Sequence, residues 1–333
     1  MTDYSETPER TLAAAEAAER ASLDPHPLIE RIAPQSRTLR CLYDLRQAPV
    51  TFDFCGFLAA ADCARQLMGL DALDITIRAG EYRDRTARDK ETVEDEKIWR
   101  THNILLDCCQ LLPTLASMTL THEDRGPYDF PAGECRAPYL TADILRLWKK
   151  GADPRVFKAP GHAKALVKQQ RGDAPYATLT LRTSAHQPQR NSDLAEWAKF
   201  HDWLLKDGYR AVVVPDQEDV TRGGEYLKHF PHVEVAGAFS LGYRMALYEG
   251  AAMNLGSTNG PLTLTTLGHA PVIQFDQLKG NVFTPRHYCT LFGFSPPKQF
   301  PWSAPDQRLA WVDSSFDNLK AEFERMMAKR KAA

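Results

Sequence analysis

The sequence predicts an α/β protein with two doubly wound domains, whose parallel sheets face a cleft. Two observations support this prediction. Residues 39–78 read as a strand, a loop, a helix and a second strand, and short apolar segments alternate with amphipathic ones again over residues 176–275. Residues 209–215 (YRAVVVP) form a continuous apolar run, which is typical of a strand buried on both faces of a parallel sheet.

The first half of the chain contains three expected strands and three expected helices. The strands are expected at 39–45, 73–77 and 117–121, and the helices at 53–68, 97–112 and 141–149. Gly69 follows the first helix directly, as a glycine at a helix C-terminus does. The charged segment between the second strand and the second helix is expected to be an exposed loop.

The second half continues the alternation and ends in a helix. Strands are expected at 176–182, 209–215, 233–236, 253–255 and 272–275, and helices at 192–207, 240–252, 262–267 and 317–330. Together these elements predict an N-terminal helical arm at 1–37, an α/β domain at 38–160, a second α/β domain at 161–315 and a C-terminal helix at 316–333.

Composition excludes several classes of protein. The net charge of −2 argues against a general nucleic-acid binder, so no nucleic acid is expected as a partner. No apolar run approaches the roughly 18–20 residues that span a membrane, and the acidic N-terminus has no apolar signal core. The 7 cysteines include no C-x-x-C pair. We therefore expect a cytoplasmic protein with neither a disulfide framework nor a zinc site.

The most informative segment is 253–275 (MNLGSTNGPLTLTTLGHAPVIQF), which reads as strand, turn, helix and strand. Its turn contains Ser257, Thr258, Asn259 and Gly260. A small, hydroxyl-rich turn between a buried strand and a helix leaves backbone N–H groups directed outward, which suits a phosphate or pyrophosphate. The alternative is an ordinary turn that uses its glycines and proline only for geometry.

Polar residues follow three expected strands of the second half, at the edge where open parallel sheets bind ligands. They are Arg182, Arg190 and Asn191 after the first strand, Asp216 after the second, and Ser257, Thr258, Asn259 and Gly260 after the third. Arginine forks and turn amides suit the phosphates of a nucleotide, and an acid suits its ribose or base. The combination predicts an anionic nucleotide ligand.

Several of these side chains also have a purely structural interpretation. Arg182 could pair with Asp216 across adjacent strand ends, and Asn191 with Ser192 could cap the following helix. Arg244, one turn into its helix, could reach either a phosphate or a neighbouring acid.

Two acids of the first half are candidate catalytic bases. Asp44 and Asp53 lie at the end of the first strand and past its loop, where a carboxylate could accept the proton of an acceptor hydroxyl. Both have alternatives: Asp53 could cap the helix that begins beside it, and Asp44 could form a salt bridge with Arg46 or Arg40.

With these residues in place, the chain resembles the carboxyl-terminal, donor-binding half of GT-B glycosyltransferases, which have two Rossmann-like domains. The segment GPLTLTTLGHAPVI is similar to an element of bacterial heptosyltransferase-like enzymes, and Arg182 with Asp216 and the Ser-Thr turn is similar to short motifs of fucosyltransferase-like enzymes. The resemblance covers about residues 176–276. It implies that Arg182 contacts the donor phosphate and that Ser257, Thr258 and Asn259 line the phosphate turn.

The resemblance implies a metal-independent transfer of a sugar from a nucleotide-sugar donor to a glycan or polysaccharide acceptor, with no cofactor. The sequence agrees, since it has neither a D-x-D triplet nor a His/Cys cluster. A peripheral position at the inner membrane is compatible with this reading, and the oligomeric state is left open. The alternatives are a non-catalytic nucleotide- or sugar-binding protein and a sugar-nucleotide epimerase; no G-x-G-x-x-G motif follows a strand to suggest a dinucleotide enzyme.

Overall fold

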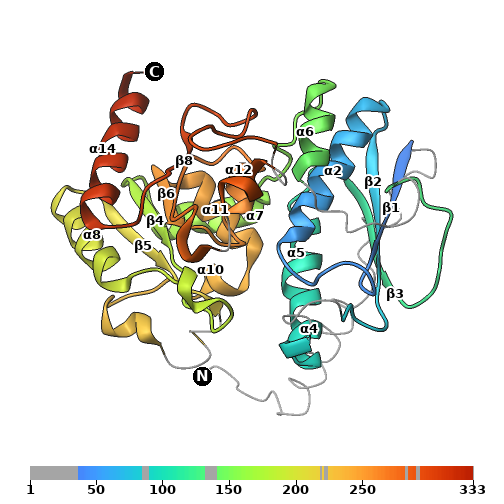
Figure 1. Ribbon diagram of the computed structural model, residues 1–333, viewed down its shortest axis with the longest axis horizontal. Coiled ribbons are helices and arrows are strands. Elements are labelled where there is room, and N and C mark those ends of the chain that lie inside the picture. The colour runs from blue at the N-terminus through green and yellow to red at the C-terminus, as the bar shows by residue number, and fades with distance from the viewer. Residues whose placement is uncertain are drawn as a thin grey trace, which may run out of the picture. The chain divides into compact units, whose positions relative to one another are not determined.

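Two parallel sheets, each packed against helices, make up the computed structural model (Figure 1). It describes residues 37–84, 90–131, 141–217, 220, 224–281, 284–289 and 293–332. Both sheets belong to one compact unit, Thr38–Ala333. The predicted arm at 1–37 lies, apart from Arg37, outside the described residues.

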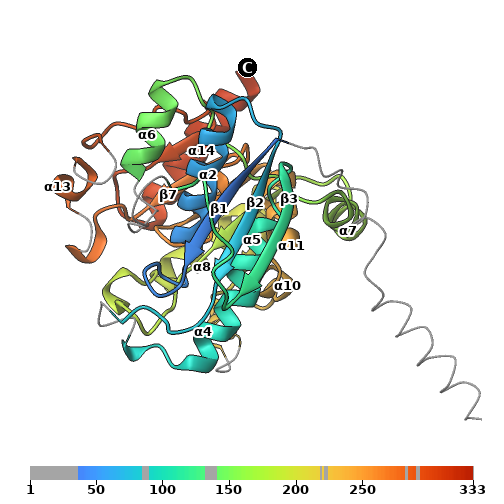
Figure 2. The same cartoon turned by 90° about the vertical axis from the view of Figure 1, so that its right-hand side faces the viewer.

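The first sheet has three parallel strands in the order β1-β2-β3. The strands are β1 (Thr38–Asp44), β2 (Ala72–Arg78) and β3 (Leu115–Thr121). The helices of this half are α2 (Asp53–Leu67), α4 (Glu94–Arg100), a π-helical segment (Thr101–Leu106), α5 (Asp107–Cys109) and α6 (Thr141–Lys149). Figure 2 views the three strands from the side away from α2. The three named strands follow the order of the chain, and after β3 the chain returns to the other side of β1, where Phe130 forms an isolated parallel bridge with Cys41.

Alternating side chains explain how β1 and α2 pack. Every second residue of β1, including Leu39, Cys41 and Tyr43, is buried. The ring of Tyr43 meets Phe54 edge-on at 4.6 Å between centroids, and α2 buries an almost continuous run of small and aromatic residues. This face fixes the position of the first turn of α2.

The second sheet is doubly wound, with five parallel strands in the order β5-β4-β6-β7-β8. Its strands are β4 (Tyr176–Thr180), β5 (Arg210–Val214), β6 (Met253–Ser257), β7 (Val272–Phe275) and β8 (Gln307–Leu309). The chain leaves β4 toward β5 on one side and later returns to β6 on the other. The strand order therefore reverses between β4 and β6.

Helices cover both faces of this sheet. The α-helices are α7 (Gly161–Arg171), α8 (Leu194–Lys206), α10 (Ala236–Phe239), α11 (Leu241–Gly250), α12 (Thr263–Thr266), α13 (Pro285–His287) and α14 (Phe316–Ala332). Short 3₁₀ turns lie at Pro188–Arg190, Glu225–Lys228 and Lys279–Asn281. On one face α8 and α14 bury Trp197, Phe200 and Phe323, while the other face packs against α7 and α11.

The α/β class and the parallel sheets are as expected from the sequence, but three details differ. The strand expected at 233–236 is absent: this segment holds no strand, and α10 begins at Ala236. Asp193, rather than Asn191 or Ser192, caps α8 by accepting hydrogen bonds from the N–H groups of Ala195 and Glu196. The short strand β8 and helix α7 were not anticipated, because neither has a distinct apolar pattern.

The domain limits expected at 160 and 161 stay a prediction. Helix α7 begins at Gly161 and packs against α11 of the second half. No helix in the described ranges is long and apolar enough to cross a membrane.

Candidate functional site

The reversal between β4 and β6 defines where a ligand fits best. In an open parallel sheet the loops after the two strands at such a point run in opposite directions and leave a crevice. The loop after β4 contains Arg182, Arg190 and Asn191, and the turn after β6 contains Thr258, Asn259 and Gly260. The structure thus brings together most of the residues that the sequence predicted for donor binding.

The turn after β6 is fixed by its own hydrogen bonds. The Thr258 N–H donates to the Phe275 carbonyl at 3.1 Å, and the Asn259 side chain donates to the Thr180 carbonyl at 3.2 Å. The Asn259 side-chain oxygen accepts the Leu262 N–H at 3.2 Å. Within the described part of the chain, the backbone N–H groups of Asn259 and Gly260 donate no hydrogen bond. Two successive amides therefore remain for an anion.

Arg190 supplies a cation beside this turn. Its guanidinium donates to the Thr258 carbonyl at 3.0 Å and to the Gln187 side chain at 2.9 Å. The side chain is half-buried. Its charge also reaches the Tyr288 hydroxyl, whose pKa is raised by burial in spite of the opposing effect of Arg190.

Arg182 has a different role from the one expected. Its guanidinium donates to the Gln187 carbonyl at 3.0 Å, to the His186 carbonyl and to the Asn191 side-chain oxygen. The Asn191 amide in turn donates to the Ser184 carbonyl at 3.1 Å. Both side chains thus hold the loop after β4 in shape, whereas the sequence predicted that Arg182 contacts a phosphate.

Ser257 is also positioned for support rather than for contact. It is fully buried, and its hydroxyl donates to the Asp276 carboxylate at 2.8 Å. The Ser192 hydroxyl lies 3.0 Å from the Ser257 hydroxyl and accepts the Arg182 N–H at 3.0 Å. Because the Ser257 proton goes to a carboxylate, the Ser192 proton goes to Ser257. Ser257 therefore cannot line the ligand side of the turn, as the sequence had suggested.

Backbone strain marks the same place. Gln187 and Asp276 are the two non-glycine residues with positive φ in the described ranges, at 52° and 58°. Such conformations are uncommon outside glycine and gather at functional sites. Gln187 accepts from both arginines of the loop after β4, and Asp276 follows β7 directly.

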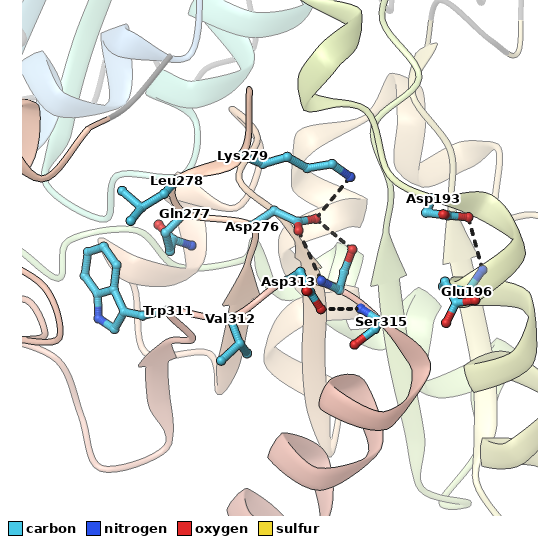
Figure 3. A pocket seen from close by; sticks show the side chains of 11 residues that line it. Asp193, Glu196, Asp276, Gln277, Leu278, Lys279, Trp311, Val312, Asp313 and Ser315 are labelled. Carbon is cyan, nitrogen blue, oxygen red and sulfur yellow. Dashed lines mark hydrogen bonds and ion pairs between the residues drawn. The ribbon is translucent and has the colours of Figure 1, made fainter. Parts of the chain in front are cut away.

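A cavity of about 390 Å³ lies nearby, beyond the ends of β7 and β8 (Figure 3). Its acids are already paired: Asp193 caps α8, Glu196 accepts the Phe316 N–H at 2.8 Å, and Asp313 accepts the Ser315 N–H at 3.1 Å. Lys279 also lines it and donates to the Asn191 carbonyl at 2.7 Å. Lys279 was missed from the sequence, although it lies only four residues after the end of β7.

Two predicted donor residues lie away from the turn. Asp216 follows β5, on the other side of β4 from β6, and its N–H donates to the Tyr226 hydroxyl at 3.0 Å. Arg244 is buried on α11, where its guanidinium donates to the Gly237 carbonyl and, at 3.5 Å, to the Pro215 carbonyl. Arg244 therefore holds main-chain segments together, a third role beside the phosphate and the acid that the sequence left open.

Asp44 is an ion-paired residue. It ends β1 with its side chain only 3% exposed, and the Arg46 guanidinium donates to it at 2.9 Å. Burial alone would raise the pKa of Asp44, but the hydrogen bonds from Arg46 outweigh it and keep the pKa below its usual value. The salt bridge to Arg46 is thus the correct alternative, while Arg40 pairs with Asp129. A carboxylate with a lowered pKa is a weak general base.

Asp53 is exposed at the first turn of α2. It does not cap the helix: Phe52 occupies the cap position, and the Asp53 carboxylate accepts the Thr51 hydroxyl at 2.8 Å. The neighbouring Phe52 ring packs against Gly260, where an added Cβ would lie 2.6 Å from the ring. Asp53 is therefore the acid candidate whose chain neighbour, Phe52, contacts the turn after β6. Phe52 was not anticipated, since nothing in its local sequence marks a long-range contact.

A small cavity of about 80 Å³ opens beside Asp53, lined also by Tyr82, Arg83, Lys97 and Arg100. Among the residues that the structure describes, no group of three or more His, Cys, Asp or Glu could hold a metal ion.

Comparison with known proteins identifies the type of fold. No protein-family model and no curated protein matches the chain. Among solved structures, a glycosyl transferase family 9 protein from Veillonella parvula is similar with a TM-score of 0.55 and 10% identity, covering 88% of this chain and 98% of that one. At this identity the likeness establishes the fold, which confirms the expected GT-B-like architecture at that level.

Two further structures are similar at lower TM-scores. Heptosyltransferase WaaC of E. coli with ADP-2-deoxy-2-fluoro heptose is 12% identical, with a TM-score of 0.42 and coverage of 86% of this chain and 99% of that one. The iron-containing dodecameric glycosyltransferase TibC from enterotoxigenic E. coli is 16% identical, with a TM-score of 0.44 and coverage of 90% and 77%.

Proposed function

We propose that this protein is a glycosyltransferase that moves a sugar from a nucleotide-sugar donor to a hydroxyl group of a glycan or polysaccharide acceptor. One observation carries the proposal: the turn with the available Asn259 and Gly260 amides accepts a hydrogen bond from Arg190 at Thr258 and packs against Phe52, the residue before Asp53. The fold shared with a glycosyl transferase family 9 protein supports it.

The donor diphosphate is proposed to lie on the turn after β6. Asn259 and Gly260 would donate their backbone N–H groups to its oxygens, and Arg190 would add charge-assisted hydrogen bonds. Arg182 and Asn191 would act indirectly, because they hold the loop that carries Arg190. Asp216, at the end of β5, remains a candidate for the ribose or base.

Asp53 is proposed as the general base of an inverting reaction. Its carboxylate would take the proton of the acceptor hydroxyl while the hydroxyl oxygen attacks the anomeric carbon of the donor sugar. The bond from that carbon to the donor phosphate breaks, and the nucleoside diphosphate leaves with the bonding electron pair. The turn amides and Arg190 stabilise the negative charge that develops on the leaving group, the part that a metal ion plays in other enzymes.

A thermal-shift screen with UDP, GDP, ADP, CDP and their sugars tests the donor class. A ligand at about 100 times its dissociation constant adds roughly 2.7 kcal/mol to the free energy of unfolding, so one nucleotide should raise the melting temperature clearly. If none does, the nucleotide-sugar proposal fails. The shift should persist in EDTA, because the proposed phosphate contacts are all protein groups.

Incubation with the selected nucleotide sugar separates the three candidate activities. A transferase should hydrolyse the donor slowly without acceptor and faster when a suitable glycan is added. A binding protein would release no nucleoside diphosphate, and an epimerase would convert the sugar while leaving the diphosphate linkage intact. The cytoplasmic location and a peripheral place at the inner membrane remain predictions, which cell fractionation checks.

A further inference from the structure

Four loops at the carboxyl edge of the second sheet converge on one buried carboxylate, that of Asp276. Its oxygens accept the Ser257 hydroxyl at 2.8 Å, the Ser314 hydroxyl at 2.7 Å and the Ser314 N–H at 3.1 Å. Ser192 reaches it through Ser257. The carboxyl ends of β4, β6, β7 and β8 are thus tied to a single side chain. Figure 3 shows Asp276 and those of its partners that line the cavity.

We propose that Asp276 is a positioning residue: it holds the turn after β6 in the shape that presents the Asn259 and Gly260 amides to the ligand. The proposal rests on the proposed function for the identity of the ligand, but the effect on the turn is independent of it. Asp276 itself is only 7% exposed, so it acts through Ser257 and not by contact.

The direction of the hydrogen bonds supports this role. A carboxylate only accepts, so the Ser257 and Ser192 protons both point along one chain toward Asp276. Both hydroxyl donors from Ser257 and Ser314 end on the same carboxylate oxygen. An asparagine offers one accepting oxygen and one NH₂ group that only donates, so it cannot receive all three donors. Either the Ser314 N–H loses its acceptor, or the Ser257 and Ser314 hydroxyls must turn around.

The position also explains why an acid occupies a strained backbone. Asp276 has a φ of 58°, which asparagine and aspartate tolerate better than other non-glycine residues. Lys279, whose ammonium lies 3.8 Å from the carboxylate, partly balances the buried charge. Because asparagine tolerates the same backbone, Asp276→Asn tests the hydrogen bonds and not the chain conformation.

The experiment compares Asp276→Asn with Asp313→Asn as a matched control. Asp313 lines the same cavity, but it accepts hydrogen bonds from Ser315 and Asn318 and, among the described residues, has none with Ser192 or Ser257. The first measurement is amide hydrogen exchange of segment 257–262 in the full chain without ligand. The second is the dissociation constant of the nucleoside diphosphate that the thermal-shift screen selects.

Asp276→Asn should speed exchange of the Thr258 and Leu262 amides about tenfold or more and weaken nucleotide binding by a similar factor, the equivalent of about 1.4 kcal/mol. Asp313→Asn should change both quantities by less than about threefold. Equal effects of the two variants, or unchanged exchange of segment 257–262 in Asp276→Asn, would overturn the proposal.

Two further outcomes are distinguishable. If the wild-type protein binds no nucleotide, the proposed function fails, while hydrogen exchange still decides the role of Asp276. If Asp276→Asn does not fold, Ser257→Ala keeps the carboxylate and removes the bond between it and β6, together with the acceptor of the Ser192 hydroxyl. It should speed exchange at Thr258 about threefold, and no change there would refute the inference. In the double variant Asp276→Asn/Ser257→Ala, exchange at Thr258 should be no faster than in the faster-exchanging single variant, because both substitutions break the same hydrogen bond.

Discussion

The two arginines of the loop after β4 should fail in different ways when they are replaced by alanine. Arg190 donates to the turn after β6, whereas Arg182 donates to three acceptors within its own loop. Arg190→Ala should therefore weaken binding of a nucleoside diphosphate and spare the fold. Arg182→Ala should chiefly destabilise the protein.

The magnitudes follow from what each guanidinium contacts. A charge-assisted hydrogen bond is worth roughly 1.5–3 kcal/mol, so Arg190→Ala should raise the dissociation constant about 10–150-fold. Arg190→Lys keeps the charge but loses the two-pronged guanidinium, so its dissociation constant should lie between those of the wild type and Arg190→Ala. Arg182→Ala leaves acceptors of a 7% exposed side chain without a donor, at a cost of about 2–4 kcal/mol. At about 2 °C per kcal/mol, the melting temperature should fall by roughly 4–8 °C.

Calorimetric titration of each variant with the selected nucleoside diphosphate, together with its melting curve, checks both parts. Affinity should be tested for Arg182→Ala well below its melting temperature, so that unfolding does not imitate weak binding. An Arg190→Ala protein with wild-type affinity would show that the ligand does not meet this turn. An Arg182→Ala protein with an unchanged melting temperature and weakened binding would restore the direct phosphate contact that the sequence suggested.

Three further predictions concern the acids and the glycines. Asp53→Asn should keep the melting temperature yet lose about 10²–10⁴ in turnover. Asp44→Asn should instead lower the melting temperature and keep most of its turnover. If the turnover of Asp53→Asn stays within about threefold of wild type, Asp53 is not the base. The pKa of Asp62 would be raised by its burial, but hydrogen bonds from an arginine, a threonine and a glutamine bring it below its usual value. Its folded pKa is the lower one, so the stability it adds is present above about pH 4 and lost as the pH falls further; urea unfolding should show the advantage of wild type over Asp62→Asn at pH 7 shrinking below pH 4, and a constant difference would contradict this. Gly256→Ala places a Cβ 2.3 Å from a main-chain oxygen of β4 and should cost about 1–3 kcal/mol, while Gly161→Ala, with nothing within 4 Å, should be neutral or stabilise by up to about 1 kcal/mol in the same assay.

The sequence determined the class of fold and much of the candidate site, because both depend on local patterns. Apolar runs bounded by turn residues located β4, β5, β6 and β7 to within about two residues. Since ligands of parallel sheets bind beyond the strand ends, the polar residues that follow those strands could be chosen in advance. This reasoning selected Arg190, Asn259 and Gly260 without any contact being known; their part in binding a donor stays a prediction.

What a side chain contacts was decided only by the tertiary structure. Arg182, Arg190 and Arg244 look alike as basic residues near strand ends, yet one holds its own loop, one reaches the turn after β6, and one is buried on α11. A long arginine side chain can reach many possible acceptors, and only the packing of the loops determines which acceptors lie within hydrogen-bond distance.

The most distant contacts were beyond the sequence for the same reason. Phe52 meets Gly260, and Ser192 meets Ser257, across separations that no local pattern encodes. Asp276 reads in the sequence as one more polar residue after a strand. It becomes the centre of four loops only because the strand order β5-β4-β6-β7-β8 brings those loops to the same edge. Strand order is set by the packing of helices on both faces of the sheet, a property of the whole chain and not of any segment.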